Sequence, residues 1–236
     1  MELTVNGATT YAYTGGKPFD AARPTVVMIH GVLNDHSVWA LQSRYLANHG
    51  FNVLAVDLPG HCRSGGEAPA SVEAAADFVG ALLDAAGVQQ AALVGHSWGS
   101  LIALEAAARL GTRATQLVMV GTAYPMRVSP ALLGLALSDP LKAIEKITRY
   151  SHAPSTDAAI VQASRSLMQA VHQREPVAQV MHTGFVACDQ YRGAEAALRW
   201  LNVPTHFVLH TSWLVTTTSI ELLVDHLYCT VFWAMK

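Results

Sequence analysis

The 236-residue sequence has few charged residues, few cysteines and no long apolar run. Charged side chains make up 14% of the chain and the formal net charge is −2, so no basic surface for nucleic acid is expected. The three cysteines are odd in number and form no CxxC pair, which favours a reducing, cytoplasmic setting over a disulfide framework. No stretch reaches the roughly 18 consecutive apolar residues of a membrane span, and no signal peptide is recognisable at the start. We therefore expect a cytoplasmic protein with no nucleic-acid partner and no membrane partner.

Motifs for metals and nucleotide cofactors are also missing. None of the 11 histidines belongs to an H-E-x-x-H pattern, and neither a GxxxxGK[ST] loop nor a GxGxxG loop is present. The sequence therefore predicts no metal and no cofactor. Hydrophobic residues, in contrast, make up 51% of the chain, which is enough for a substantial core.

Apolar runs and helical patterns alternate along the first half of the chain. Asn6-Gly7 is typical of a tight hairpin, here between two short strands at a sheet edge. Continuous apolar runs predict strands buried on both faces at residues 24–29, 51–56, 91–94 and 116–121. Helical spacing predicts helices at about 37–48, 71–86 and 98–110. This alternation predicts an α/β fold with a doubly wound, mostly parallel sheet.

The pattern changes after residue 124. Helical patterns occur at 132–137, 141–150, 158–172 and 194–200, with no convincing strand between 130 and 200. The run Pro204–Leu209 then resumes the sheet. We predict an α/β core formed by residues 1–123 and 201–236, with residues 124–200 inserted as a helical cap.

The chemistry of the chain centres on Gly95-His96-Ser97-Trp98-Gly99. This Gly-x-Ser-x-Gly pattern follows a predicted strand and precedes a predicted helix, which is typical of a nucleophile elbow. Glycine suits both flanking positions, because a Cβ in so sharp a turn would meet the neighbouring strand or helix. The alternative is a glycine-rich turn in which Ser97 only caps the helix.

Three signatures in order give the chain a resemblance to a known family. They are His30-Gly31-Val32 with Trp39 downstream, the run Asp57-Leu58-Pro59-Gly60-His61-Cys62-Arg63-Ser64, and the Gly95–Gly99 pattern. Over about residues 1–210 the chain resembles the α/β-hydrolase fold family. It looks most like the small cofactor-free serine esterases and peroxidase-like members that carry a helical cap. The epoxide hydrolases and haloalkane dehalogenases of this fold use Asp as the nucleophile, so Ser97 argues against them.

The resemblance implies roles for three residues. Ser97 would attack a carbonyl carbon and form an acyl-enzyme. The backbone N–H groups of Trp98 and Val32 would form the oxyanion hole. The substrate would be a small ester or related acyl compound, bound between these residues and the cap.

Other polar residues of the three signatures are predicted to be structural. His30 is expected to hold its loop by hydrogen bonds, and Asp57 and Arg63 are expected to fix theirs. His96 is not expected to be the base, because consecutive side chains diverge in a tight turn. Similar sequences usually have Gly at the position of Cys62, so a positive φ there would strain this residue. A reactive thiol at Cys62 is the weaker alternative.

The acid and the base of a catalytic triad are missing from their expected places. In this fold the chain order is Ser, then Asp or Glu, then His. Trp213 occupies the position at which the family carries Asp, and the alternative acid position, residues 122–124, has no carboxylate. His226 is the one remaining candidate base in the right order, yet neither Glu221 nor the adjacent Asp225 is well spaced to orient it.

Residues 205–236 also differ from the rest in composition, with no Gly and no Pro. We interpret this tail as an altered or truncated C-terminus, such as a change of reading frame would produce. The main functional prediction is a serine hydrolase that acts on carboxylic esters. The alternatives are a catalytically impaired hydrolase-fold protein with a binding role or none, and a peroxidase-like or acyl-transfer variant. The oligomeric state cannot be predicted from the sequence.

Overall fold

A computed structural model describes residues 1–20, 22–174, 179–209 and 229–233 of the chain. In these residues eight strands form one sheet in the order β1-β2-β4-β3-β5-β6-β7-β8. Strands β3 to β8 are parallel, and β1 and β2 form an antiparallel hairpin at one edge. The strands are β1 (Glu2–Val5), β2 (Ala8–Tyr13), β3 (Thr25–Ile29), β4 (Asn52–Val56), β5 (Ala91–His96), β6 (Ala114–Val120), β7 (Thr205–Leu209) and β8 (Cys229–Trp233). The predicted α/β fold with a mostly parallel sheet is confirmed.

Helices follow the strands as the spacing predicts, with one exception. The first half holds η1 (His36–Trp39), α1 (Ala40–Asn48), α2 (Val72–Ala85), α3 (Trp98–Leu110) and η2 (Gly111–Arg113). The second half holds α4 (Pro130–Ser138), α5 (Pro140–Tyr150), α6 (Ala158–Arg174), α7 (Val180–Gln190) and α8 (Ala194–Trp200). Helix α7 was not predicted, because its sequence VMHTGFVACDQ combines β-branched residues with a glycine and has no clear apolar stripe.

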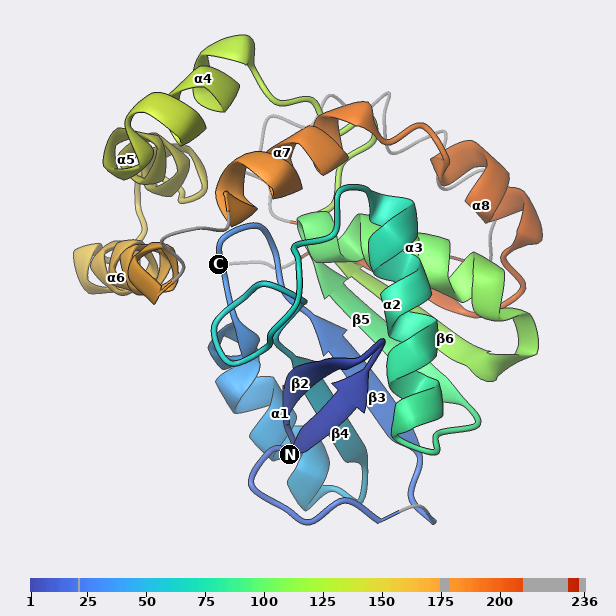
Figure 1. Cartoon of the computed structure of the whole chain (residues 1–236). Helices are drawn as coiled ribbons and strands as arrows, with labels where there is room; N and C mark the ends of the chain where they lie inside the picture. Colours follow the sequence, from blue (N-terminus) through green and yellow to red (C-terminus); the bar gives the residue numbers. More distant parts are fainter. Residues whose placement is uncertain (21, 175–178, 210–228, 234–236) are drawn as a thin grey trace.

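The two faces of the sheet bury alternate residues of the same strands. Val27 and Ile29 of β3 belong to a core cluster with α2, α3 and α8, while Val26 and Met28 pack with Trp39 and α1. In Figure 1, α2 and α3 lie in front of the sheet and α1 lies behind it. Every residue of β3 and β4 is buried, as a strand covered on both faces requires.

The helices between β6 and β7 pack in two groups. Residues of α4, α5, α6 and the first turn of α7 form a cluster of their own, which Leu33 of the loop after β3 also joins. The rest of α7 and α8 pack on the main core beside α3. In Figure 1, α4, α5 and α6 stand as a separate lobe, and α7 crosses above the end of β5. The insertion is thus tied to the core through α7 and α8.

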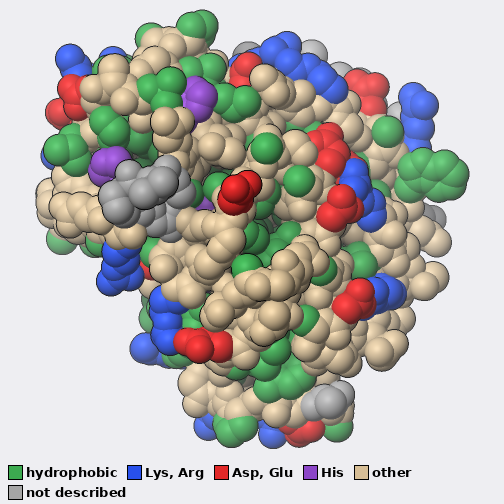
Figure 2. Space-filling model, in the orientation of Figure 1, with side chains coloured by type: hydrophobic (Ala, Val, Ile, Leu, Met, Phe, Trp, Pro, Cys, Tyr) green, Lys and Arg blue, Asp and Glu red, His purple; other side chains and the backbone are tan. Residues whose placement is uncertain are grey.

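Charges of both signs are scattered over the face of the molecule shown in Figure 2. On the face in Figure 2, Lys and Arg side chains alternate with Asp and Glu side chains among apolar groups. Within the described residues, no helix has the length and apolar character that crossing a membrane would require.

Candidate active site

Ser97 occupies a strained turn between β5 and α3. Its φ is 53° and its ψ is −121°, a backbone conformation that non-glycine residues rarely adopt. A Cβ at Gly95 would meet backbone atoms of Gly99 and Ser100, and one at Gly99 would meet the carbonyl oxygens of Ile29 and His30. The two glycines therefore let the start of α3 lie directly against β5 and β3, as predicted for an elbow.

The loop after β3 lies beside Ser97. A Cβ on Gly31 would be 3.2 Å from the Ser97 Cβ, so a larger residue there would push the loop and the elbow apart by a few tenths of an ångström. The chain then passes through Val32 to Leu33, which is buried and has a φ of 56°. This second positive φ gives the loop its sharp bend, and nothing in the sequence identified it.

The amide of Val32 is oriented through the carbonyl that precedes it. The Gly31 oxygen accepts hydrogen bonds from His30 Nδ1 at 2.8 Å and from the Asn34 N–H at 3.3 Å. The C=O and N–H of a trans peptide point in opposite directions, so the anchored carbonyl fixes the direction of the Val32 N–H. His30 Nε2 in turn accepts the Leu58 N–H at 3.1 Å, which fixes the imidazole itself. Burial is the main cause that lowers the pKa of His30, so the ring is neutral at pH 7.

The amide of Trp98 is oriented in the same way. The Ser97 carbonyl accepts the Ser100 N–H at 2.8 Å and the Ser100 hydroxyl at 2.5 Å. The Ser97 N–H donates to the Val120 oxygen at 2.9 Å, which holds the turn from its other side. In the part of the chain that the structure describes, neither the Val32 N–H nor the Trp98 N–H donates to a protein acceptor. The peptide units that carry these two amides are thus each held through a carbonyl oxygen.

The loop after β4 is fixed by its own polar side chains, as predicted. Asp57 Oδ1 accepts two hydrogen bonds from His36, one from its N–H and one from Nδ1, both at 2.8 Å. Burial alone would raise the pKa of the Asp57 carboxyl, but these hydrogen bonds outweigh it and hold the pKa below its ordinary value. The Asp57 Oδ2 accepts the Arg63 N–H at 3.3 Å, and the Arg63 guanidinium lies 3.5 Å from the ring centre of Tyr11.

Cys62 has the positive φ that its place in the sequence suggested. Its φ is 48°, in the region that favours glycine, so the predicted backbone strain is confirmed. Its Sγ lies 3.5 Å from Asp35 Oδ2. Burial and the neighbouring Asp35 charge raise the pKa of the Cys62 thiol to about 12, which keeps it protonated near neutral pH.

Helix α7 packs over Val32 and Trp98. A Cβ at Gly184 would lie 3.0 Å from Val32 Cγ2 and 3.5 Å from Trp98 Cε3. Val32 also contacts both hydrophobic clusters, the main core and the one formed by α4 to α7. The helices between β6 and β7 therefore pack directly on the loop after β3 and on the start of α3.

The part of the chain that the structure describes contains no base hydrogen-bonded to Ser97. Within the described residues, no imidazole nitrogen hydrogen-bonds to Ser97 Oγ. The His96 ring lies between two glycines, with Nδ1 facing Gly31 and Nε2 facing Gly121. Burial, followed by the charge of His30, lowers the pKa of His96 to about 4. The substitutes considered for the acid and the base, Glu221, Asp225 and His226, lie outside the described residues, as does Trp213 at the expected acid position.

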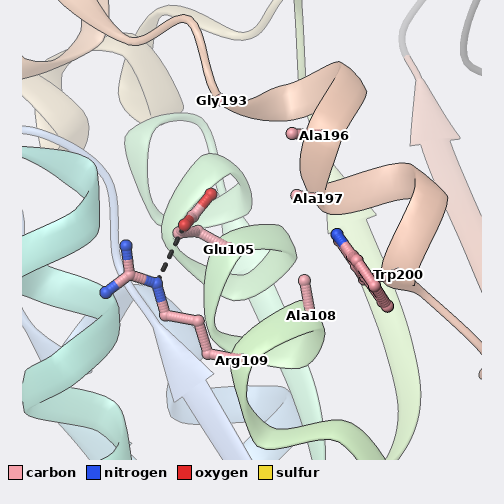
Figure 3. Close-up of a pocket in the computed structure, with 7 residues that line it drawn as sticks. All are labelled: Glu105, Ala108, Arg109, Gly193, Ala196, Ala197 and Trp200. Atoms are coloured by element: carbon pink, nitrogen blue, oxygen red, sulfur yellow. Dashed lines mark hydrogen bonds and ion pairs between the residues drawn. The ribbon is translucent and has the colours of Figure 1, made fainter.

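A separate cavity of about 190 Å³ lies between α3 and α8 and contains none of the three candidate residues. Its lining includes Glu105 and Arg109 of α3, which point toward each other, and Trp200 of α8 (Figure 3). The Glu105 carboxylate is already paired on both oxygens, by Arg109 Nε at 2.8 Å and by the Tyr191 hydroxyl at 2.7 Å. Arg109 also bonds Asp77 of α2, so this network ties α2, α3 and the segment between α7 and α8 together.

Clusters of three or more His, Cys, Asp or Glu side chains that could hold a metal ion do not occur in the described part of the chain.

Comparison with known proteins places the chain in context. Residues 24–171, well over half of the chain, match a family model described as alpha/beta hydrolase fold. An epoxide hydrolase from Caballeronia sordidicola is 33% identical over 110 residues, which are 45% of this chain and 32% of the relative. Lipase LipV from Mycobacterium tuberculosis is 34% identical over 101 residues, 43% of this chain and 38% of the relative. The chain thus spans only about a third of the length of the curated relatives it matches.

Solved structures match over nearly the whole chain. An esterase from Exiguobacterium antarcticum has a TM-score of 0.82 at 16% identity, covering 98% of this chain and 90% of that one. An enol-lactonase from Burkholderia xenovorans has a TM-score of 0.77 at 20% identity, covering 98% and 90%. At these identities the likeness shows the fold.

Proposed function

Because the chain belongs to the α/β-hydrolase fold family, we propose that it is a serine hydrolase acting on carboxylic esters or related small acyl compounds through an acyl-enzyme on Ser97. The observation that carries this proposal is the pair of oriented amides beside the serine. Val32 N–H and Trp98 N–H follow anchored carbonyls on the two loops that meet at Ser97.

The proposed mechanism follows from this arrangement. The Ser97 hydroxyl attacks the carbonyl carbon of the ester, and the carbonyl oxygen becomes an oxyanion. The Val32 and Trp98 amides donate to that oxygen in the tetrahedral intermediate. Removal of one such donor typically costs on the order of 10²–10³ in turnover, so their fixed direction matters for rate. Collapse of the intermediate expels the alcohol and leaves the acyl group on Ser97, and water then releases the acid.

Proton transfer requires a base, for which His226 is our candidate. The second candidate is a catalytically impaired hydrolase-fold protein that binds a ligand or has no role. The observation that favours it is that no described imidazole hydrogen-bonds to Ser97 Oγ. Epoxide hydrolysis is not proposed, although several relatives carry that name, because Ser97 stands where such enzymes use Asp.

We further propose that residues 124–200 act as a cap on a core of residues 1–123 and 201–236. The packing that supports this is the cluster shared by α4 to α7 and its contact with Leu33 and Val32. A cap in this place would select the acyl group by the shape of its inner surface, so the partner would be a small molecule.

The test measures activation of Ser97 and turnover separately. Wild type, Ser97→Ala and the control Ser138→Ala, a change of an exposed serine on α4, are treated with a fluorophosphonate probe and with short-chain p-nitrophenyl esters. We expect labelling and hydrolysis in wild type and Ser138→Ala, and neither in Ser97→Ala. Labelling without hydrolysis, with products that partition to an added alcohol, would indicate acyl transfer. A folded wild-type protein that shows neither would establish the impaired reading.

A further inference from the structure

We propose that Ser100 and Thr122 are positioning residues that aim the Trp98 amide at the oxyanion. The inference rests on the proposed function and concerns side chains to which the sequence assigned no role. Ser100 follows the Gly-x-Ser-x-Gly pattern in α3, and Thr122 follows β6 at the position where a carboxylate is missing.

The hydrogen bonds between these residues run in one direction. Ser100 Oγ lies 2.5 Å from the Ser97 carbonyl oxygen and 2.8 Å from Thr122 Oγ1. A carbonyl oxygen carries no proton, so Ser100 must give its single hydroxyl proton to Ser97. Ser100 Oγ can then only accept from Thr122, whose hydroxyl is the donor. The result is a relay from the Thr122 hydroxyl through the Ser100 hydroxyl to the Ser97 carbonyl.

Burial makes this relay strong. Ser100 is 0% exposed and Thr122 is 1% exposed, so water does not compete for either hydroxyl. The peptide unit that the relay holds belongs to a residue with φ of 53°, a conformation that persists only where surrounding contacts enforce it. The Ser97 N–H to Val120 bond and the Thr122 relay come from the same end of β6. The end of β6 therefore holds both peptide units that flank Ser97, one through the Ser97 N–H and the other through the Ser97 carbonyl.

The relay acts on chemistry through a single peptide plane. The Ser97 carbonyl and the Trp98 N–H belong to the same peptide unit. Loss of the hydroxyl bond leaves the Ser100 N–H as the donor to that carbonyl, so the unit can rotate about this one remaining bond. Rotation moves the N–H away from the oxyanion without changing how the ground-state ester is held. The same logic applies to the other amide, where Leu58 and His30 hold the Gly31 carbonyl. Each amide of the proposed oxyanion hole thus has its own buried relay.

The test removes the Thr122 hydroxyl and compares the effect with that of removing a buried threonine hydroxyl elsewhere in the chain. Thr122→Val removes the hydroxyl at nearly constant shape, and Thr122→Ser restores it. Thr148→Val is the matched control, because Thr148 is 0% exposed and bonds the Ile144 carbonyl at 2.7 Å in α5. Ser100→Ala serves as a second variant that breaks the same relay.

We expect Thr122→Val and Ser100→Ala to slow fluorophosphonate labelling of Ser97 about 10-fold, a fraction of the loss of a whole oxyanion donor. In ester turnover the loss should fall on kcat with KM nearly unchanged. Thr122→Ser should recover most of the rate, and Thr148→Val should label as wild type does despite a similar fall in its denaturation midpoint. Wild-type labelling rates in folded Thr122→Val and Ser100→Ala would overturn the inference.

A readout independent of activity separates this inference from the proposed function. The ¹H–¹⁵N resonance of the Trp98 amide should shift in Thr122→Val and stay in place in Thr148→Val. If the wild-type protein neither reacts with the fluorophosphonate probe nor hydrolyses esters, the proposed function fails. The spectrum still shows whether the Thr122 and Ser100 hydroxyls orient the Trp98 amide. An unmoved Trp98 resonance in Thr122→Val refutes the relay in either case.

Discussion

The close approach of α3 to β3 at Gly99 can be tested by adding one methyl group. In Gly99→Ala the new Cβ would lie 2.6 Å from the His30 carbonyl oxygen and nearer still to that of Ile29. Both oxygens belong to backbone that cannot rotate away, so α3 must shift. Forced overpacking of this kind typically costs about 1–3 kcal/mol. We expect Gly99→Ala to lose at least that much stability.

Gly80→Ala in α2 is the matched control. Nothing lies within 4 Å of a Cβ at Gly80, and the residue sits in the interior of a helix. Alanine there should stabilise the protein by roughly 0.5–1 kcal/mol. The two substitutions, chemically identical, should therefore differ by about 1.5–4 kcal/mol in the free energy of unfolding.

The assay is guanidinium denaturation of both variants, with fluorophosphonate labelling as a second measurement. Gly99→Ala should lower the midpoint and slow or abolish labelling of Ser97, while Gly80→Ala should raise the midpoint and leave labelling unchanged. Equal midpoints for the two variants would refute the close packing of the elbow against β3.

Three further predictions concern strain, pH and the α2–α3 network. Because Cys62 has a φ of 48°, Cys62→Gly should stay within about 1 kcal/mol of wild type and Cys62→Val should lose about 1–3 kcal/mol in denaturation; equal losses would contradict the strain. Burial, followed by the charge of His30, lowers the pKa of His61 in the folded protein to about 3. In the unfolded chain the pKa of His61 is about 6.5, so between pH 6.5 and pH 3 the unfolded chain binds a proton that the folded protein does not. His61 should therefore contribute a fall in stability of up to about 1.4 kcal/mol per pH unit as the pH drops from 6.5 toward 3. Denaturation midpoints of His61→Asn should fall less steeply over that range than those of wild type, with the rest of the slope coming from buried His30 and His96. Tyr191→Phe should lower the free energy of unfolding by about 1.5 kcal/mol, the low end for a hydrogen bond to a charged group, because the Glu105 carboxylate still pairs with Arg109. Tyr150→Phe, a change at an exposed tyrosine, should cause no measurable loss in the same denaturation experiment.

Local patterns were sufficient to predict most of the fold. Buried strands are continuous apolar runs, and α2 begins where Ser71 caps it, with its side chain accepting the Ala74 N–H. The boundaries predicted for α3 and α8 match the structure because each has a strong apolar pattern. Helix α7 was missed because tertiary contacts, through Gly184 and the residues around it, stabilise a segment whose own propensity is weak.

The candidate site was predictable only where a residue type is demanded by backbone geometry. Gly95, Gly99 and Cys62 could be recognised, because tight turns and positive φ leave few choices. The relay through Ser100 and Thr122 joins residues 22 positions apart, and its direction follows from proton counting in three dimensions. Serine and threonine are common, so no local signal in the sequence marks that pair.

Gly184 makes selectivity and rate difficult to engineer separately. Helix α7, part of the proposed cap, rests through Gly184 on the side chains of Val32 and Trp98, the residues whose amides are the proposed oxyanion donors. A library that enlarges residue 184 would push on both residues in the same step. Variants selected at residue 184 for a new substrate should therefore also show altered turnover. A compensating change is best sought in Val32, whose side chain lies nearest to a Cβ at residue 184.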